Sequence, residues 1–163
     1  SLLNEEPPVT EDELFARRPL GMRMAMLVRQ WRATIDHALA DTGLTQSGWT
    51  VLMQLRQLGD NVSVSELAEV QGIELPPLMR TLTQLETLGL IVRSTSPYDR
   101  RIRLLTLTAE GRVMLEKITS VIETCQQRAS QNIPAENMDI FSATLNQIAC
   151  NLRLMRSEDN KTQ

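Results

Sequence analysis

The sequence lacks the features that a membrane or secreted protein needs. All of its apolar stretches are broken by charge within a few residues, whereas a membrane-spanning helix needs roughly eighteen or more consecutive apolar residues. The first residues contain neither a basic region nor an apolar run, so the sequence predicts no secretory signal. We therefore expect no membrane association and a location in the cytoplasm.

Cysteine, histidine and aromatic residues are also scarce. The 163 residues include two cysteines (Cys125 and Cys150), one histidine (His37) and five aromatic residues. A structural zinc site needs four soft ligands, so neither a metal nor a cofactor is expected. Few aromatic residues also argue against a surface that stacks single-stranded bases. Both cysteines fall on apolar faces of expected helices, which favours packing over redox sensing.

Charge is unevenly distributed along the chain. Seventeen basic and 20 acidic residues give a net charge of -3, but binding to nucleic acid depends on where charge lies. Residues 1–16 hold five acids and no base, and residues 1–18 are expected to form a flexible acidic arm. Residues 93–103 hold four arginines and one aspartate, a local charge of +3. This basic segment is a candidate contact for a polyanion.

Hydrophobic periodicity predicts a mainly α fold with a small β-hairpin. Residues 19–156 are expected to form one domain, followed by a frayed tail at 157–163. Two β-rich runs, residues 90–95 and 103–108, flank a polar turn and predict a hairpin whose basic part is 93–103. The order of a short helix, a turn at Gly72, a second helix and a basic hairpin describes a winged helix-turn-helix. The expected helices span about 20–40, 45–58, 65–71, 75–88, 109–130 and 135–155.

The helix expected at 75–88 has two contrasting faces. Leu75, Leu78, Leu82 and Leu85 form a stripe that we expect to be buried. The opposite face is small or hydrogen-bonding, and the Arg80 guanidinium has the geometry to read guanine in a major groove. This second face consists of Pro76, Pro77, Arg80, Thr83, Gln84 and Thr87, with Thr81 at its margin.

At these positions the sequence resembles a known family. Residues 73–91, the Asp99-Arg100-Arg101 motif and residues 105–111 are similar to the MarR family of bacterial transcription regulators. Residues 27–37 and 44–49 resemble its SlyA-like branch. The resemblance covers about residues 20–155 and implies a homodimer that places two winged modules on a palindromic operator in double-stranded DNA. The implied dimerisation helices are those at 20–40, 109–130 and 135–155.

The resemblance also implies roles for individual residues. Arg101 would enter the minor groove, with Asp99 holding it and Arg100 supporting the wing or a phosphate contact. A proline at position 77 departs from the small hydroxyl residue usual in the family, and so removes one hydrogen bond. The residues implied to face bases or nearby phosphates are Pro76, Pro77, Arg80, Thr81 and Gln84. Those implied to offer a helix amino terminus to a phosphate are Thr45, Gln46 and Ser47.

A second implied property is release from DNA by a small aromatic carboxylate. The candidate ligand-binding residues are Arg29, Trp31, His37 and Trp49. Each has an alternative interpretation, because large aromatic residues usually pack in a core or dimer interface and His37 suits a helix surface. Met26 stands where the resemblance leads us to expect a basic residue.

The sequence therefore predicts a homodimeric, sequence-specific DNA-binding transcription regulator. The alternative is a winged-helix module that binds proteins without useful DNA affinity, which would suit the net charge of -3. An enzyme is not expected, because the chain offers no nucleophile–base pair, phosphate-binding loop or paired catalytic groups.

Overall fold

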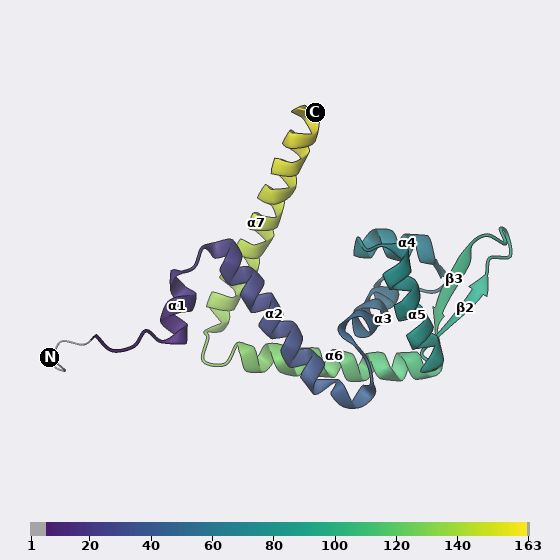
Figure 1. The fold of residues 1–163 in the computed structure, drawn as a ribbon, viewed down its shortest axis with the longest axis horizontal. Helices are drawn as coiled ribbons and strands as arrows, with labels where there is room; N and C mark the ends of the chain where they lie inside the picture. Colours follow the sequence, from purple (N-terminus) through teal and green to yellow (C-terminus); the bar gives the residue numbers. More distant parts are fainter. Residues whose placement is uncertain (1–5, 163) are drawn as a thin grey trace. The chain divides into compact units, whose positions relative to one another are not determined.

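The computed structural model describes residues 6–162 in two compact units, one up to Cys125 and the other from Gln126 (Figure 1). Most of the chain is helical, and the short strands form one antiparallel sheet. No described helix is long and apolar enough to cross a membrane. The elements are α1 (Glu11–Arg17), α2 (Leu20–Ala38), the 3-10 turn η2 (Ala40–Thr42), α3 (Gln46–Leu58), β1 (Val62–Ser63), α4 (Val64–Gln71), α5 (Leu75–Thr87), β2 (Ile91–Thr95), β3 (Arg103–Leu107), α6 (Ala109–Ala129) and α7 (Ala135–Thr162).

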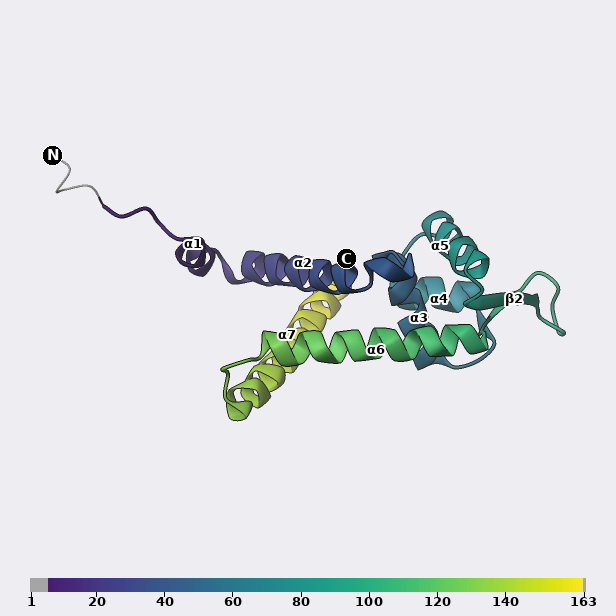
Figure 2. The ribbon, with the colours of Figure 1, turned by 90° about the horizontal axis from the view of Figure 1, so that it is seen from below.

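The first unit contains the winged helix-turn-helix. The Ser63 hydroxyl accepts the Glu66 amide to begin α4, and Gly72 ends that helix with a left-handed φ of 64°. After the turn comes α5, and β2 and β3 form a hairpin that projects away from α3, α4 and α5 (Figures 1 and 2). The hairpin prediction was incomplete, because β1 pairs with β3 and makes a three-stranded sheet in the order β1-β3-β2. Two residues are too few to show a strand period.

The core lies among α3, α5, the sheet and the start of α6. Leu78, Leu82 and Leu85 are fully buried, as their spacing predicts. Leu75 is instead half exposed, because it opens α5 at the edge of the buried stripe. The other fully buried large side chains are Leu39, Val51, Leu52, Leu55, Leu67, Ile91, Leu105 and Ile118.

The start of α6 is locked against the base of the wing. Thr108 donates its hydroxyl to the Gly89 carbonyl at 2.6 Å and accepts the Gly111 amide at 3.0 Å, so it caps α6. The Thr108 amide also donates to the Leu90 carbonyl at 3.1 Å. A Cβ on Gly111 would lie 2.1 Å from that carbonyl oxygen, so only glycine fits this close approach.

The expected acidic arm is wrong for residues 11–17, which form α1. Thr10 and Glu13 make a reciprocal capping box, and acidic side chains in the first turn suit the positive end of a helix dipole. Arg23 of α2 lies over the Phe15 ring, 5.1 Å from its centroid. Residues 1–5 lie outside the described part of the chain.

The expected frayed tail is likewise wrong for residues 157–162, which continue α7. Nothing after Met155 breaks a helix, because this segment contains neither glycine nor proline. Gln163 lies outside the described residues. No described residue of α7 is buried, and its large apolar side chains include Ile140, Phe141, Leu145, Leu152 and Met155, which are all exposed.

Candidate nucleic-acid interface

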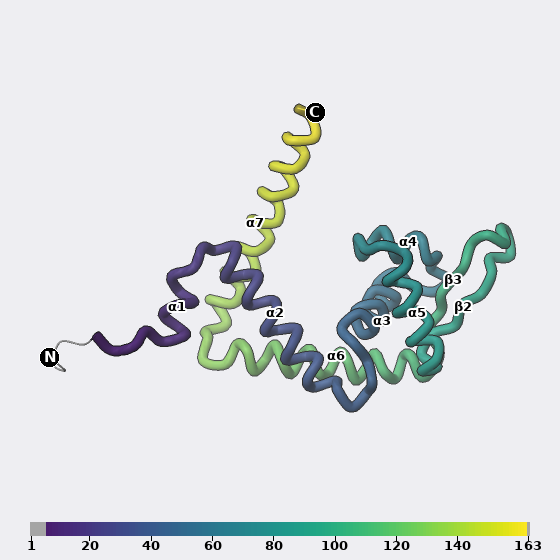
Figure 3. Tube along the Cα trace, viewed as in Figure 1, coloured from purple at the N-terminus to yellow at the C-terminus, as the bar shows by residue number. Residues whose placement is uncertain are grey.

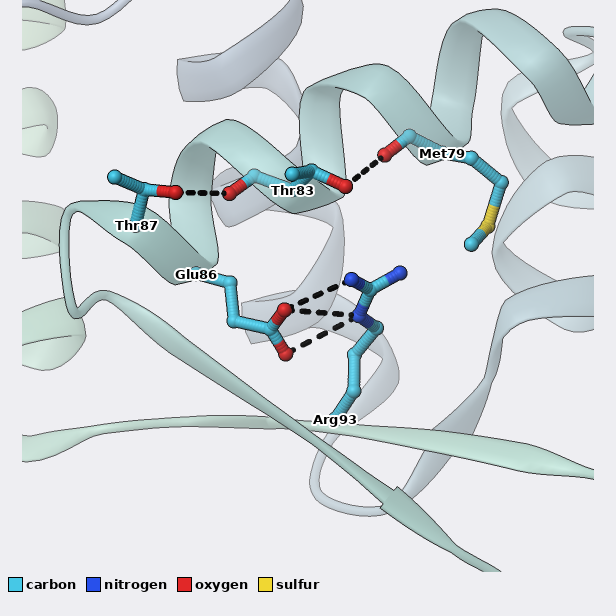
Figure 4. Close-up of polar contacts among 5 residues, drawn as sticks. All are labelled: Met79, Thr83, Glu86, Thr87 and Arg93. Carbon is cyan, nitrogen blue, oxygen red and sulfur yellow. Dashed lines mark hydrogen bonds and ion pairs between the residues drawn. The ribbon is translucent and has the colours of Figure 1, made fainter.

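One face of α5 is exposed along its whole length. Pro76 and Pro77 lie in the first turn, where the helix needs no amide donors, and the Arg80 and Gln84 side chains follow on the same exposed face. The Thr83 hydroxyl donates to the Met79 carbonyl and the Thr87 hydroxyl to the Thr83 carbonyl, both at 2.9 Å (Figure 4). Because these hydroxyl protons are already used, Arg80 and Gln84 are the side-chain donors that this face can offer to a ligand.

Thr81 does not belong to the exposed face, in contrast to the expectation from sequence. Its side chain is buried, with the residue only 7% exposed, and its hydroxyl donates to the Pro77 carbonyl at 3.2 Å. The helical wheel places Thr81 at a margin, and packing assigns that margin to the core. Thr81 is therefore not available to a base edge.

The tip of the wing is a closed turn between β2 and β3 (Figure 3). The Ser96 amide donates to the Ile102 carbonyl at 3.0 Å, and the Ile102 amide donates to the Asp99 carbonyl at 3.1 Å. The buried Ser96 hydroxyl accepts the Tyr98 amide at 3.2 Å. These bonds fix the backbone of the turn, and Tyr98 at its tip is 96% exposed.

Asp99 and Arg101 make a two-pronged contact at this tip. Arg101 donates Nε to Asp99 Oδ1 at 3.1 Å and Nη2 to Oδ2 at 3.0 Å, and its amide also donates to Oδ1. Hydrogen bonds from Arg101 hold the pKa of Asp99 below its ordinary value, and the same contact raises the pKa of Arg101. These hydrogen bonds restrict the orientation of the Arg101 side chain. The side chain is nevertheless 90% exposed and remains accessible to a ligand. Arg100, which precedes Arg101 in the turn, is also exposed.

Arg93 is not a free positive charge of the wing, although its sequence neighbourhood suggests one. It is paired with Glu86 of α5, at 2.8 Å from Nη2 to Oε1 (Figure 4). Four arginines in residues 93–103 therefore face two carboxylates, Asp99 and Glu86, and the local charge is +2 rather than +3. Among the described residues, the positive charge of this segment that is not balanced by a carboxylate therefore lies toward the tip of the wing.

The amino terminus of α3 is accessible beside this module. Thr45 caps it by accepting the Gly48 amide at 3.4 Å, and both Thr45 and Ser47 are exposed. Gln46 is partly buried, and with its amide oxygen turned toward Arg32 it accepts two guanidinium hydrogen bonds at 3.1 Å. The Gln46 side chain is therefore engaged with α2, whereas the first-turn amides remain a potential phosphate contact.

The four predicted ligand-binding residues are not brought together. Trp49 is 9% exposed and donates its indole N–H to Asp36 at 2.7 Å, while Trp31 packs against the core. His37 is exposed on α2. Residues two apart on a helix lie about 200° apart, so Arg29 and Trp31 point to different sides. Arg29 instead lines a cavity of about 380 Å³ between α2 and α3, together with Ala25, Val28, Arg32, Ala33, Asp36 and Gln46.

Sequence reasoning missed Glu86 and Tyr98 as features of this surface. Glu86 follows the buried Leu85 on α5, and only its spatial meeting with Arg93 distinguishes it from an ordinary surface acid. Tyr98 lies in the polar turn, and its position between Pro97 and Asp99 could have marked it as an exposed aromatic residue.

Comparison with known proteins agrees with this architecture. The MarR family profile matches residues 44–102. The structure of the transcriptional regulator PA3341 is 31% identical, with a TM-score of 0.72, and the match covers 83% of this chain and 98% of that one. The transcriptional repressor CouR, bound to a 23-mer DNA duplex, is 28% identical, with a TM-score of 0.74 and coverages of 88% and 99%. A cysteine-to-serine mutant of MarR from E. coli, complexed with operator DNA, is 24% identical, with a TM-score of 0.71 and coverages of 80% and 93%. By its sequence match and its fold, this chain belongs to the MarR family of DNA-binding transcription regulators, which are not enzymes.

Proposed function

We propose that the protein is a homodimeric regulator that reads a palindromic DNA operator. The observation that carries this proposal is the pairing of an open, hydrogen-bonding face on α5 with an arginine held at the tip of the adjoining wing. A major groove admits one helix, and a narrow minor groove attracts an arginine. Arg80 and Gln84 would meet base edges, with Pro76 and Pro77 against the groove wall, while Arg101 enters the minor groove.

The contacts to the DNA backbone are assigned to two further places. Thr45 and Ser47 would present the amino terminus of α3 to a phosphate, where unpaired amides and the helix dipole favour an anion. The exposed Arg100 guanidinium would contact a phosphate beside the minor groove. Such contacts fix the register of the protein on the duplex, and the base contacts of α5 supply specificity.

The homodimer is supported by apolar surface that the single chain leaves uncovered. Large apolar side chains of α7 are exposed, and so are Leu20, Met22, Leu27 and Val28 of α2. A second copy of the chain would cover such surface in an isologous contact. Two modules related in this way would address half-sites roughly 34 Å apart, one turn of the duplex.

Ligand control and the SlyA-like branch remain part of the proposal. The cavity lined by Arg29 and Arg32 offers the Arg29 guanidinium to a small aromatic carboxylate, while the Arg32 guanidinium is engaged with Gln46. Binding there would release DNA by favouring a dimer in which the two α5 helices no longer match the half-site spacing. The SlyA-like assignment rests on the similarity of residues 27–37 and 44–49 to that branch.

The proposal is tested with a duplex that the wild-type protein selects from a random-sequence library. Gel-shift affinity for this duplex should fall steeply with salt, because neutralised phosphates release counterions, and Arg101→Ala should weaken it about tenfold. If the protein selects no sequence from the library, or if its affinity for DNA does not change with salt concentration, the result would instead support the protein-interaction alternative. In the same assay, salicylate as a probe carboxylate should release the duplex from wild type but not from Arg29→Ala.

A further inference from the structure

The ion pair between Glu86 and Arg93 joins two different elements of the DNA-binding module. Glu86 lies in the last turn of α5 and Arg93 in the middle of β2. Arg93 donates Nε to both carboxylate oxygens, at 3.2 and 3.1 Å, and Nη2 to Oε1 at 2.8 Å (Figure 4). A guanidinium held through two nitrogens is fixed in orientation as well as in distance.

The wing has a second attachment to α5 at its base. The Leu90 amide donates to the Leu85 carbonyl at 3.0 Å, just before β2 begins. Gly89 makes the intervening turn with a φ of 75°. The hairpin is thus attached to α5 itself at its base and again at Arg93, while its other strand, β3, is held by pairing with β1.

The attachment at Arg93 matters because the tip of the wing is far from the attachment at Leu90. Strands rise about 3.3 Å per residue, so the tip lies roughly 20 Å beyond the base, and a 10° swing would move it by about 3 Å. Such a displacement is as large as the whole length of a hydrogen bond. Arg101, at the tip, would then miss a groove position that α5 has already fixed.

We propose that Glu86 and Arg93 are positioning residues that hold the wing at one angle to α5, so that Arg80 and Arg101 engage neighbouring grooves at the same time. This inference rests on the proposed function and concerns how that surface is aligned. Neither residue needs to contact DNA. The two side chains are 23% and 36% exposed, so the pair is partly buried, and the folding stability of each variant is measured beside its DNA binding.

Charge provides a first test, because two explanations predict opposite signs. Glu86→Gln makes the protein one unit more positive, so electrostatics alone would strengthen binding to the selected duplex. Positioning predicts weaker binding, by about fivefold to tenfold, and the same loss for Arg93→Gln. Asp41→Asn is the matched control, since it makes the same charge change in another 2.8 Å ion pair, Asp41–Lys117, and should not weaken binding.

Coupling to Arg101 provides the decisive test. If the pair acts by placing Arg101, then Arg101→Ala should cost about tenfold in wild type but less than about threefold in Glu86→Gln. Hydroxyl-radical protection of the flanking minor groove should disappear in Glu86→Gln while protection over the α5 site remains. The exchange Glu86→Arg with Arg93→Glu should restore most of the affinity.

The proposal is overturned if Arg101→Ala has the same effect in both backgrounds, or if Glu86→Gln binds as well as wild type. Loss of every protection together with a lowered melting temperature would assign the pair to folding and would also overturn it. A wild-type protein that selects no duplex would overturn the proposed function itself, which is a separate and recognisable result.

Discussion

At the scale of residues, the exposed face of α5 is narrower than its sequence suggests. Arg80 and Gln84 retain free donors, whereas Thr81 is buried and the Thr83 and Thr87 hydroxyl protons are bonded to carbonyls of their own helix. In the proposed complex with DNA, hydrogen-bond donation from side chains to bases therefore depends on these two residues. Because only two side chains are involved, the contribution of each to DNA binding can be measured with a single substitution.

We expect Arg80→Ala to weaken binding to the selected duplex by about tenfold to a hundredfold, because a bidentate contact to guanine is lost. Thr81→Val removes only a buried hydroxyl and should leave the affinity within about twofold of wild type. Fluorescence anisotropy titrations at one salt concentration give both values. A loss with Thr81→Val equal to that with Arg80→Ala would return Thr81 to the DNA contacts.

A second residue-scale prediction concerns the stability of the module. Gly111→Ala should lower the free energy of unfolding by about 2–3 kcal/mol, because the new Cβ would force α6 away from the Leu90 carbonyl. Gly21→Ala, in α2, is the control, since a Cβ at Gly21 would meet no atom within 4 Å. Urea denaturation at a fixed protein concentration compares them. Equal stabilities would contradict the close approach.

At the scale of elements, the wing carries two ion pairs, Glu86–Arg93 and Asp99–Arg101, in addition to its strand pairing. One pair ties β2 to α5, and the other fixes an arginine within the turn. Hydrogen bonds from Arg93 are the main cause that holds the pKa of Glu86 below its ordinary value of 4.5, and the same contact raises the pKa of Arg93. The strength of the first pair can therefore be followed by titration.

The acid titration of Glu86 should have its midpoint below 4.5 in the folded protein. Because the folded pKa is the lower one, the stabilisation from this pair is fully present above 4.5 and is lost as the pH falls through the folded value. Carbon-13 NMR of the Glu86 carboxyl group measures the midpoint directly. Arg93→Gln should return it toward 4.5, and an unchanged midpoint would show that Arg93 is not the cause.

At the scale of the whole molecule, apolar surface and DNA geometry favour the same assembly. Phe141, Leu145, Leu152 and Met155 follow one another at spacings of four, seven and three residues along α7, a row that we call the seam, and all four are exposed in the single chain. Exposed large side chains in such a row normally mark a protein contact. A twofold assembly through this row would give one molecule two winged modules, which is the number that the proposed palindromic operator needs.

Sedimentation equilibrium should therefore give twice the mass of one chain, and Leu152→Glu should give monomers. The monomer should bind the selected duplex at least about a hundredfold more weakly, because two linked half-site contacts become one. Ala143→Glu adds the same charge at an exposed position of α7 away from the seam and should remain dimeric. Dimeric Leu152→Glu would move the interface elsewhere.

The main helices and the wing could be predicted from sequence because their signals are local. Apolar spacing, the Ser63 cap, Gly72 and the prolines of α5 specify where helices begin, end and turn. The capping box of α1 was also present in the sequence but was outweighed by the acidic composition of that segment. A local signal can thus be missed, yet it needs no distant partner.

Other features depended on which segments meet in space. A helical wheel gives the centre of a buried stripe, but neighbouring elements decide its edges, so Thr81 became buried and Leu75 exposed. Glu86 meets Arg93 only because the turn at Gly89 brings β2 back along α5, and Arg29 and Trp31 separate because one helix carries them on different sides. The sequence by itself determines residue types and local periodicity, and through them the helices and turns. The tertiary structure decides which side chains of different elements pair, because those pairs form only when the elements pack together.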